Sequence, residues 1–148
     1  YIIAPPEIID RAKKVHDFLT VGAAAPLQEA VVTGLKMGQD YYDDLQAKYT
    51  HKKDLFLKGL DDLKITHTNP QGAYYVLLDI AEFGYENDLA FCEDLAHYVG
   101  VGAVPGSSFF REPVNNLIRL HFAKKDETLL DALNRLEGLR DKIKPKHR

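Results

Sequence analysis

An apolar stretch near the C-terminal end of the chain, residues 117–123, constrains the fold more than any other segment. It reads Leu-Ile-Arg-Leu-His-Phe-Ala, and its two-residue alternation predicts a β-strand. One face of this predicted strand carries Arg119 and His121 among apolar neighbours. A guanidinium in such surroundings must bind an anion or remain open to solvent. The face expected to lie in a hydrophobic core carries Ile118, Leu120 and Phe122.

Two interpretations of Arg119 follow from the strand alone. Its guanidinium carries a fixed fork of donors that binds a carboxylate through two parallel hydrogen bonds, which a lysine cannot do. An arginine on an edge strand is also commonly exposed to water, without any binding role. The strand alone does not distinguish an anion-binding arginine from an ordinary surface residue.

Length and composition indicate one globular domain over residues 1–148, since 45% of the 148 residues are hydrophobic and 28% are charged. A net charge of −3 argues against nucleic acid as a partner, and no apolar run approaches the ~20 residues that span a membrane. The single cysteine, Cys92, is predicted to be a buried, unreactive thiol in a reducing compartment, so we expect a cytoplasmic protein. Six scattered histidines lack metal-ligand spacing, and no metal site is predicted.

Hydrophobic periodicity predicts an α+β fold, in which a small mixed or antiparallel sheet is covered by helices. We expect a break in the second helix near Gly38, because Gly34 and Gly38 each cost up to about 1 kcal/mol relative to alanine. Tyr41, Tyr42 and Tyr49 recur at helical spacing, which predicts packing in the core. The predicted helices cover residues 7–19, 26–63, 87–99 and 126–143, and the predicted strands cover residues 72–79, 101–104 and 117–123.

Individual residues mark the ends of these elements. Asn87 and Asp126 are placed to cap the third and fourth helices, and Gly100 supplies the C-terminal turn of the third. Pro105 and Gly106 have the chemistry of a type II turn. The glycines at 100, 102 and 106 lack the Gly-Lys-Ser/Thr of a phosphate-binding loop and do not open a helix, so we interpret them as structural.

Three blocks and the opening segment carry a resemblance to a known family. Residues 70–75 read Pro-Gln-Gly-Ala-Tyr-Tyr, residues 101–109 read Val-Gly-Ala-Val-Pro-Gly-Ser-Ser-Phe, and residues 118–123 read Ile-Arg-Leu-His-Phe-Ala. With the opening Tyr-Ile-Ile-Ala-Pro-Pro, this order resembles the C-terminal small domain of class I/II aminotransferases, the aspartate aminotransferase group. Those enzymes have fold type I and use pyridoxal phosphate. The resemblance implies a fragment, in which residues 1–24 connect to a preceding cofactor-binding large domain.

The resemblance also assigns a role to Arg119. In the family, the arginine of this block binds the α-carboxylate of the amino-acid substrate as a bidentate pair. Phe109 or Phe110 would lie near the substrate side chain. Thr20 would approach the cofactor phosphate of the neighbouring subunit in a homodimer. The enzyme would move an amino group between an amino acid and a 2-oxo acid.

No lysine of this chain has the environment expected of a catalytic amine. A lysine that binds the cofactor covalently needs desolvation or a neighbouring cation to lower its pKa, whereas these lysines fall on polar helix faces or at turns. The resemblance places that lysine, the aspartate that pairs with the pyridine nitrogen and most phosphate ligands before Tyr1. We therefore predict no catalytic residue within this chain, and neither pyridoxal phosphate binding nor transamination by this chain alone.

Other functions stay open at this point. The same fold supports C–S lyases and cyclopropane-carboxylate synthase-like enzymes that also use pyridoxal phosphate. A stand-alone regulatory module would use Arg119 to hold an amino-acid carboxylate, and an interaction domain would pair Arg119 with a surface carboxylate. No residue indicates whether the substrate side chain is acidic, aromatic or aliphatic.

Overall fold

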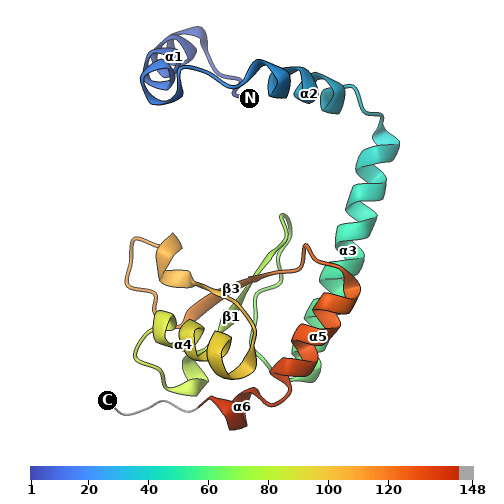
Figure 1. Cartoon of the computed structure of the whole chain (residues 1–148), viewed down its shortest axis with the longest axis vertical. Coiled ribbons are helices and arrows are strands. Elements are labelled where there is room, and N and C mark those ends of the chain that lie inside the picture. The colour runs from blue at the N-terminus through green and yellow to red at the C-terminus, as the bar shows by residue number, and fades with distance from the viewer. Residues whose placement is uncertain (144–148) are drawn as a thin grey trace. The chain divides into compact units, whose positions relative to one another are not determined.

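The structure is a computed structural model that describes residues 1–143 (Figure 1). The chain divides into two compact units, and each is described separately. The first unit comprises residues 1–43, and the second begins at Asp44. All strands belong to the second unit, so the first unit is helical.

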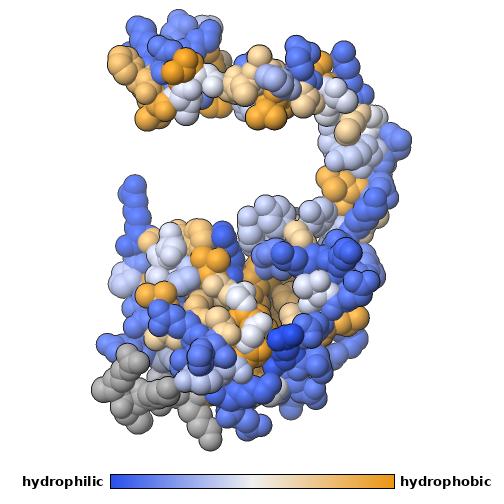
Figure 2. All heavy atoms as spheres, in the orientation of Figure 1, coloured by the Kyte–Doolittle hydropathy of each residue, from blue (hydrophilic) through white to orange (hydrophobic). Residues whose placement is uncertain are grey.

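The N-terminal unit contains α1 (Pro6–Thr20) and α2 (Ala25–Leu35). Pro6 occupies the first turn of α1, where its missing N–H costs no hydrogen bond. Neither helix buries a residue within the part of the chain that the structure describes. Figure 2 accordingly shows hydrophobic residues, in orange, on the surface of this unit. The large exposed apolar side chains of the two helices belong to Ile8, Val15, Phe18, Leu19, Leu27, Val31, Val32 and Leu35.

The long predicted helix is interrupted, because α2 ends before Gly38 and α3 (Gln39–Asp62) begins after it. This confirms the break expected near Gly38. The prediction that Tyr41 and Tyr42 pack in the core is wrong, since each is 45% exposed and their rings contact each other edge to face. Tyr49 does pack against the core, because the C-terminal half of α3 carries the buried residues of this helix. Those residues are Phe56, Leu57 and Leu60.

The three predicted strands form one antiparallel sheet, which confirms the expected arrangement. The strand order is β1-β3-β2, so β3 lies in the middle. In the register, Arg119 lies opposite Leu77 on one side and Val104 on the other. Each strand is shorter than predicted, and residues 101–103 precede β2 instead of forming it. The bounds are Tyr75–Asp79 for β1, Val104–Pro105 for β2 and Leu117–His121 for β3.

The predicted helix over residues 87–99 is confirmed, with a change of geometry in its second half. Asn87 caps α4 (Asp88–Asp94), and its side chain accepts a hydrogen bond of 2.9 Å from the Ala90 N–H. A π-helical segment, η2 (Leu95–Val99), continues α4, and Gly100 ends it with a φ of 74°. The short 3₁₀ turn η1 precedes this helix at Ala81–Phe83.

The last helix differs from the prediction in two respects. It is split into α5 (Asp126–Leu136) and α6 (Leu139–Lys142), because Gly138 between them is unfavourable inside a helix. Lys125, not Asp126, is the N-cap residue of α5. Asp126 is instead the first residue of the helix, where its negative charge interacts favourably with the helix dipole.

The core lies between one face of the sheet and the helices of the second unit. Ile118, Leu120 and Phe122 are 1%, 7% and 1% exposed, which confirms their predicted burial. Val76 and Leu78 of β1 are buried on the same face. The structure therefore confirms the α+β fold with a small sheet covered by helices. The helical residues in this core include Phe56, Leu60, Phe91, Leu95, Leu129, Leu133 and Leu136.

The predicted type II turn at Pro105 and Gly106 is wrong. Pro105 has the expected φ of −56° and ψ of 130°, but Gly106 starts a short 3₁₀ helix, η3 (Gly106–Phe109), and does not have positive φ. Glycine is needed at this position for a different reason. A Cβ atom on Gly106 would lie 2.5 Å from the carbonyl oxygen of Leu117, so η3 packs directly on the start of β3.

Candidate functional site

Arg119 lies on the face of the sheet opposite the core. It is half-buried, whereas its strand neighbours Ile118 and Leu120 are buried, as the alternation predicts. Because β3 is the middle strand, both adjacent strands pair with it and fix the backbone that carries Arg119.

Two aromatic rings lie over the Arg119 guanidinium. Its central carbon is 4.2 Å from the centroid of the Tyr75 ring and 3.9 Å from the centroid of the Phe109 ring. A planar guanidinium stacks on aromatic faces while its N–H groups point outward in its own plane. Within residues 1–143 these N–H groups have no hydrogen-bond or ion-pair partner. The stacked arrangement therefore leaves the donor edge of Arg119 free to bind an anion.

Phe109, not Phe110, reaches Arg119. Phe109 is the last residue of η3, and half of its surface remains exposed beside the guanidinium. Phe110 follows in extended conformation and is 41% exposed. Within the described residues the Phe110 ring makes no aromatic or cation contact. Of the two phenylalanines, Phe109 is therefore the one whose ring lies on Arg119 among the described residues.

His121 shares the face of Arg119 and lies opposite Tyr75 in the register. Its ring meets the Tyr74 ring edge-on, with the centroids 6.4 Å apart. Burial lowers the pKa of His121, and the positive charges of Lys124 and Arg119 lower this pKa further. These effects favour the neutral form of the His121 ring.

Thr20, the residue expected near the cofactor phosphate, ends α1 in the N-terminal unit. Its exposed hydroxyl donates to the carbonyl oxygen of His16 at 3.3 Å and lies 3.2 Å from the His16 ring nitrogens. The carbonyl end of a helix favours cations over anions, so α1 itself adds nothing to phosphate binding. The role of Thr20 stays a prediction.

The lysines and the possible metal ligands of the chain offer no second site within the described residues. None of the lysines in residues 1–143 is buried, although Lys52 and Lys53 on α3 are half-buried. The same residues contain no group of three or more His, Cys, Asp or Glu side chains that could hold a metal ion. Within residues 1–143, no helix combines the length and the apolar character needed to span a membrane.

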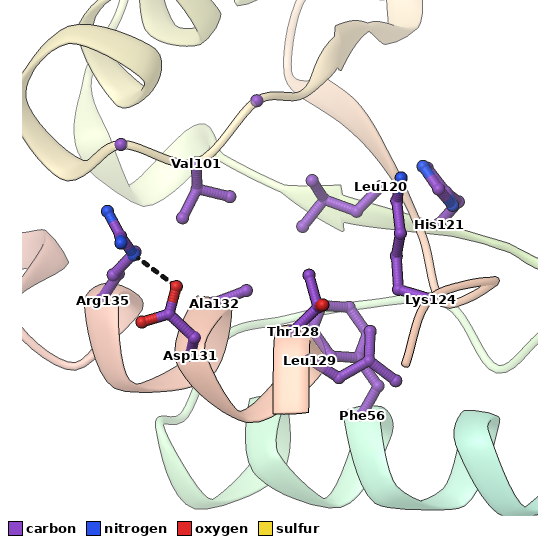
Figure 3. A pocket seen from close by; sticks show the side chains of 12 residues that line it. Phe56, Val101, Leu120, His121, Lys124, Thr128, Leu129, Asp131, Ala132 and Arg135 are labelled. Carbon is purple, nitrogen blue, oxygen red and sulfur yellow. Dashed lines mark hydrogen bonds and ion pairs between the residues drawn. The ribbon is translucent and has the colours of Figure 1, made fainter. Parts of the chain in front are cut away.

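A cavity of about 310 Å³ lies in the second unit, between α3, α5, the end of β3 and residues 100–102 (Figure 3). Its apolar lining includes Phe56 and Leu129. Figure 3 shows Asp131 and Arg135 joined by an ion pair, which measures 2.8 Å, at its edge. Arg119 does not line this cavity. Tyr75 and Phe109 do not line it either, whereas His121 does.

Sequence reasoning missed two residues at this site. Tyr75 is opposite His121 and therefore diagonal to Arg119, a relationship that appears only when the strand register is known. Asp88 has 1% of its surface exposed and accepts hydrogen bonds from Ser107 in η3. Its position just after the cap residue is typical of an ordinary first-turn acid, so the sequence carries no signal for its burial.

Comparison with known sequences identifies the family. The family described as "Aminotransferase class I and II" matches residues 1–136. The methionine aminotransferase of Escherichia coli (strain K12) is 35% identical over 140 residues, which cover 94% of this chain and 36% of that protein. A probable kynurenine–oxoglutarate transaminase of Saccharomyces cerevisiae is 28% identical over 156 residues, covering 91% of this chain and 35% of that protein.

Solved structures agree. The N-succinyldiaminopimelate aminotransferase of Mycobacterium tuberculosis superposes with a TM-score of 0.83 and 30% identity, covering 92% of this chain and 36% of that one. The Escherichia coli methionine aminotransferase structure gives a TM-score of 0.78 and 34% identity, covering 91% of this chain and 36% of that one. The chain thus spans about 36% of the length of the relatives it matches. It belongs to the class I and II aminotransferase family.

Proposed function

We propose that the whole protein containing this chain is a pyridoxal-phosphate-dependent aminotransferase that moves an amino group between an amino acid and a 2-oxo acid. The observation that carries the proposal is the Arg119 guanidinium. It is half-buried, stacked on two aromatic rings and, within residues 1–143, without an anion of its own. Amino acids and 2-oxo acids share an α-carboxylate, so one arginine can serve both substrates.

In this proposal Arg119 binds the α-carboxylate through two parallel hydrogen bonds. The rings of Tyr75 and Phe109 keep water from the faces of the guanidinium, which strengthens its attraction for the carboxylate. The bound carboxylate then orients the Cα–H bond of the substrate, so this chain contributes to catalysis by positioning. Pyridoxal phosphate, when bound, supplies the delocalised electron acceptor for the charge left on Cα.

We propose that residues outside this chain make the covalent link to the cofactor. The lysines of residues 1–143 are not buried, and a covalent link requires a lysine whose neutral form is favoured by its surroundings. Thr20 is proposed to donate its hydroxyl to the cofactor phosphate of the neighbouring subunit in a cytoplasmic homodimer. To do so, the hydroxyl would exchange its hydrogen bond to the His16 carbonyl for one to the phosphate.

Arg119→Lys in the full-length protein tests the proposal. Lysine keeps the charge but loses the fork, so kcat/KM for amino and 2-oxo acids is expected to fall about thirty- to more than a hundredfold, or roughly 2–3 kcal/mol. Arg111→Lys is the matched control, because Arg111 is exposed in the connection after η3, and its kcat/KM should change by less than about twofold. An Arg119→Lys enzyme with unaltered kcat/KM, or one that fails to fold, contradicts the assigned role.

The 148-residue chain alone is expected neither to transaminate nor to bind pyridoxal phosphate covalently. The check is incubation with the cofactor, reduction with borohydride and peptide mass spectrometry. Stoichiometric labelling of one lysine would be incompatible with this expectation. Specific binding of an amino acid by the chain alone would instead favour a regulatory module, and release of ammonia and sulfide by the full-length protein would favour a C–S lyase.

A further inference from the structure

Asp88 is the one charged side chain that is buried among residues 1–143, with 1% of its surface exposed. A buried carboxylate is unfavourable unless hydrogen bonds compensate for the loss of water. Helix capping does not explain it, because Asn87 already caps α4 through the hydrogen bond from the Ala90 N–H. The burial of the Asp88 carboxylate therefore has a reason other than helix capping.

Both carboxylate oxygens of Asp88 accept hydrogen bonds from Ser107. The Ser107 N–H donates to Oδ2 at 2.7 Å, and the Ser107 hydroxyl donates to Oδ1 at 3.0 Å. The two residues are 19 positions apart in the sequence, and Ser107 is the second residue of η3. Asp88 thus ties the start of α4 to the turn that follows β2.

This turn carries the ring that lies on Arg119. Phe109 follows Ser107 by two positions, and its ring centroid is 3.9 Å from the guanidinium carbon. Phe109 is 50% exposed, so core packing does not fix its ring. The turn is held on two sides instead, by the hydrogen bonds of Asp88 and by β3, on which Gly106 packs.

We propose that Asp88 and Ser107 are positioning residues for Arg119. Their hydrogen bonds hold η3 so that the Phe109 ring stays on the guanidinium. The inference rests on the proposed binding of a carboxylate by Arg119. A guanidinium that is already held in place loses less conformational freedom when it binds the carboxylate. Binding then costs less free energy, and kcat/KM is higher.

Ser107→Ala in the full-length protein removes one of the two hydrogen bonds. Its matched control is Ser108→Ala, because Ser108 is the exposed neighbour of Ser107. The substrate is the amino acid converted fastest in a panel of natural L-amino acids. Ser107→Ala is expected to lower kcat/KM about fivefold, whereas Ser108→Ala should change it by less than about twofold. Ser107→Thr keeps the hydroxyl and should also stay within about twofold.

A double-mutant cycle separates positioning from a general loss of structure. In the Phe109→Leu background, Ser107→Ala should change kcat/KM by less than about twofold, because the ring that the turn holds is gone. An equal loss in both backgrounds overturns the proposal. Equal kcat/KM values for Ser107→Ala and Ser108→Ala overturn it as well.

A spectroscopic measurement keeps this test separate from the proposed function. Fluorophenylalanine is introduced at position 109, and the fluorine resonance is recorded for each serine variant. Ser107→Ala is expected to shift and broaden the resonance, and Ser108→Ala to leave it unchanged; a resonance that both variants leave unchanged overturns the proposal. Unaltered kcat/KM in Arg119→Lys contradicts the proposed function, and the fluorine spectra then still decide whether Ser107 fixes Phe109.

Discussion

The guanidinium carbon of Arg119 lies 4.2 Å from the centre of the Tyr75 ring, although these residues do not face each other across the strands. Arg119 is opposite Leu77, and Tyr75 is opposite His121, so the contact is diagonal. Aromatic and long side chains reach such diagonal neighbours on one face of a sheet. Tyr75 therefore holds the guanidinium from β1, while Phe109 reaches it from η3.

Tyr75→Leu in the full-length protein is expected to lower kcat/KM about three- to tenfold, because the cation–ring contact with Arg119 is lost. Tyr75→Phe keeps the ring and should stay close to the unsubstituted protein. Steady-state kinetics on one amino acid and one 2-oxo acid check both variants. If Tyr75→Phe is as impaired as Tyr75→Leu, the hydroxyl and not the ring is the important group.

Gly106→Ala is expected to destabilise the second unit by about 1–3 kcal/mol, because the new Cβ would lie 2.5 Å from the Leu117 carbonyl oxygen and force η3 away from β3. Gly102→Ala is the control, since no atom lies within 4 Å of a Cβ placed there. Denaturant unfolding of both variants measures the difference. Equal stability would show that η3 can move without cost.

Lys124→Ala is expected to raise the pKa of His121, which burial, Lys124 and Arg119 all lower. Lys125→Ala is the control, because Lys125 is not among the charges that act on His121. Nuclear magnetic resonance titration of the ring protons checks this. Since the unfolded chain binds this proton more readily, His121 should make the free energy of unfolding fall as the pH drops below about 6.5. A pKa that is the same in both variants contradicts the assigned cause.

Cys92 is expected to react slowly with iodoacetamide at about pH 8 and rapidly once the chain is unfolded. Burial, and then the nearby negative charge of Asp88, raise the pKa of the Cys92 thiol to about 11. The unfolded chain loses this proton first, so the free energy of unfolding should fall as the pH rises from about 9 to about 11. Cys92→Ala should remove that part of the pH dependence; an unchanged curve would show that other groups cause it.

The fold was largely predictable because its periodic segments agree with its tertiary contacts. The alternation in residues 117–123 predicted both the buried triplet and the open face with Arg119. The glycine at 38 predicted the end of one helix and the start of the next. Tyr41 and Tyr42 show where periodicity fails, because it identifies a stripe on a helix but not whether another element covers that stripe.

The surroundings of Arg119 could not be predicted in the same way. The stacking of Tyr75 depends on the register between β1 and β3, and that of Phe109 depends on a 3₁₀ turn where the sequence suggested a type II turn. The burial of Asp88 depends on a hydrogen-bond partner 19 residues away. Each feature is a long-range relationship, which local propensity does not encode.

The middle position of β3 has a consequence for how sequences of this kind can diverge. The backbone of Arg119 is fixed by strands on both sides, whereas Tyr75 and Phe109 come from two separate segments. Replacement of either aromatic residue alters the size and polarity of the surroundings while the arginine backbone keeps its place. Under the proposed function, substitutions at these two positions would change how the guanidinium is oriented and what surrounds it, without displacing the strand that carries it.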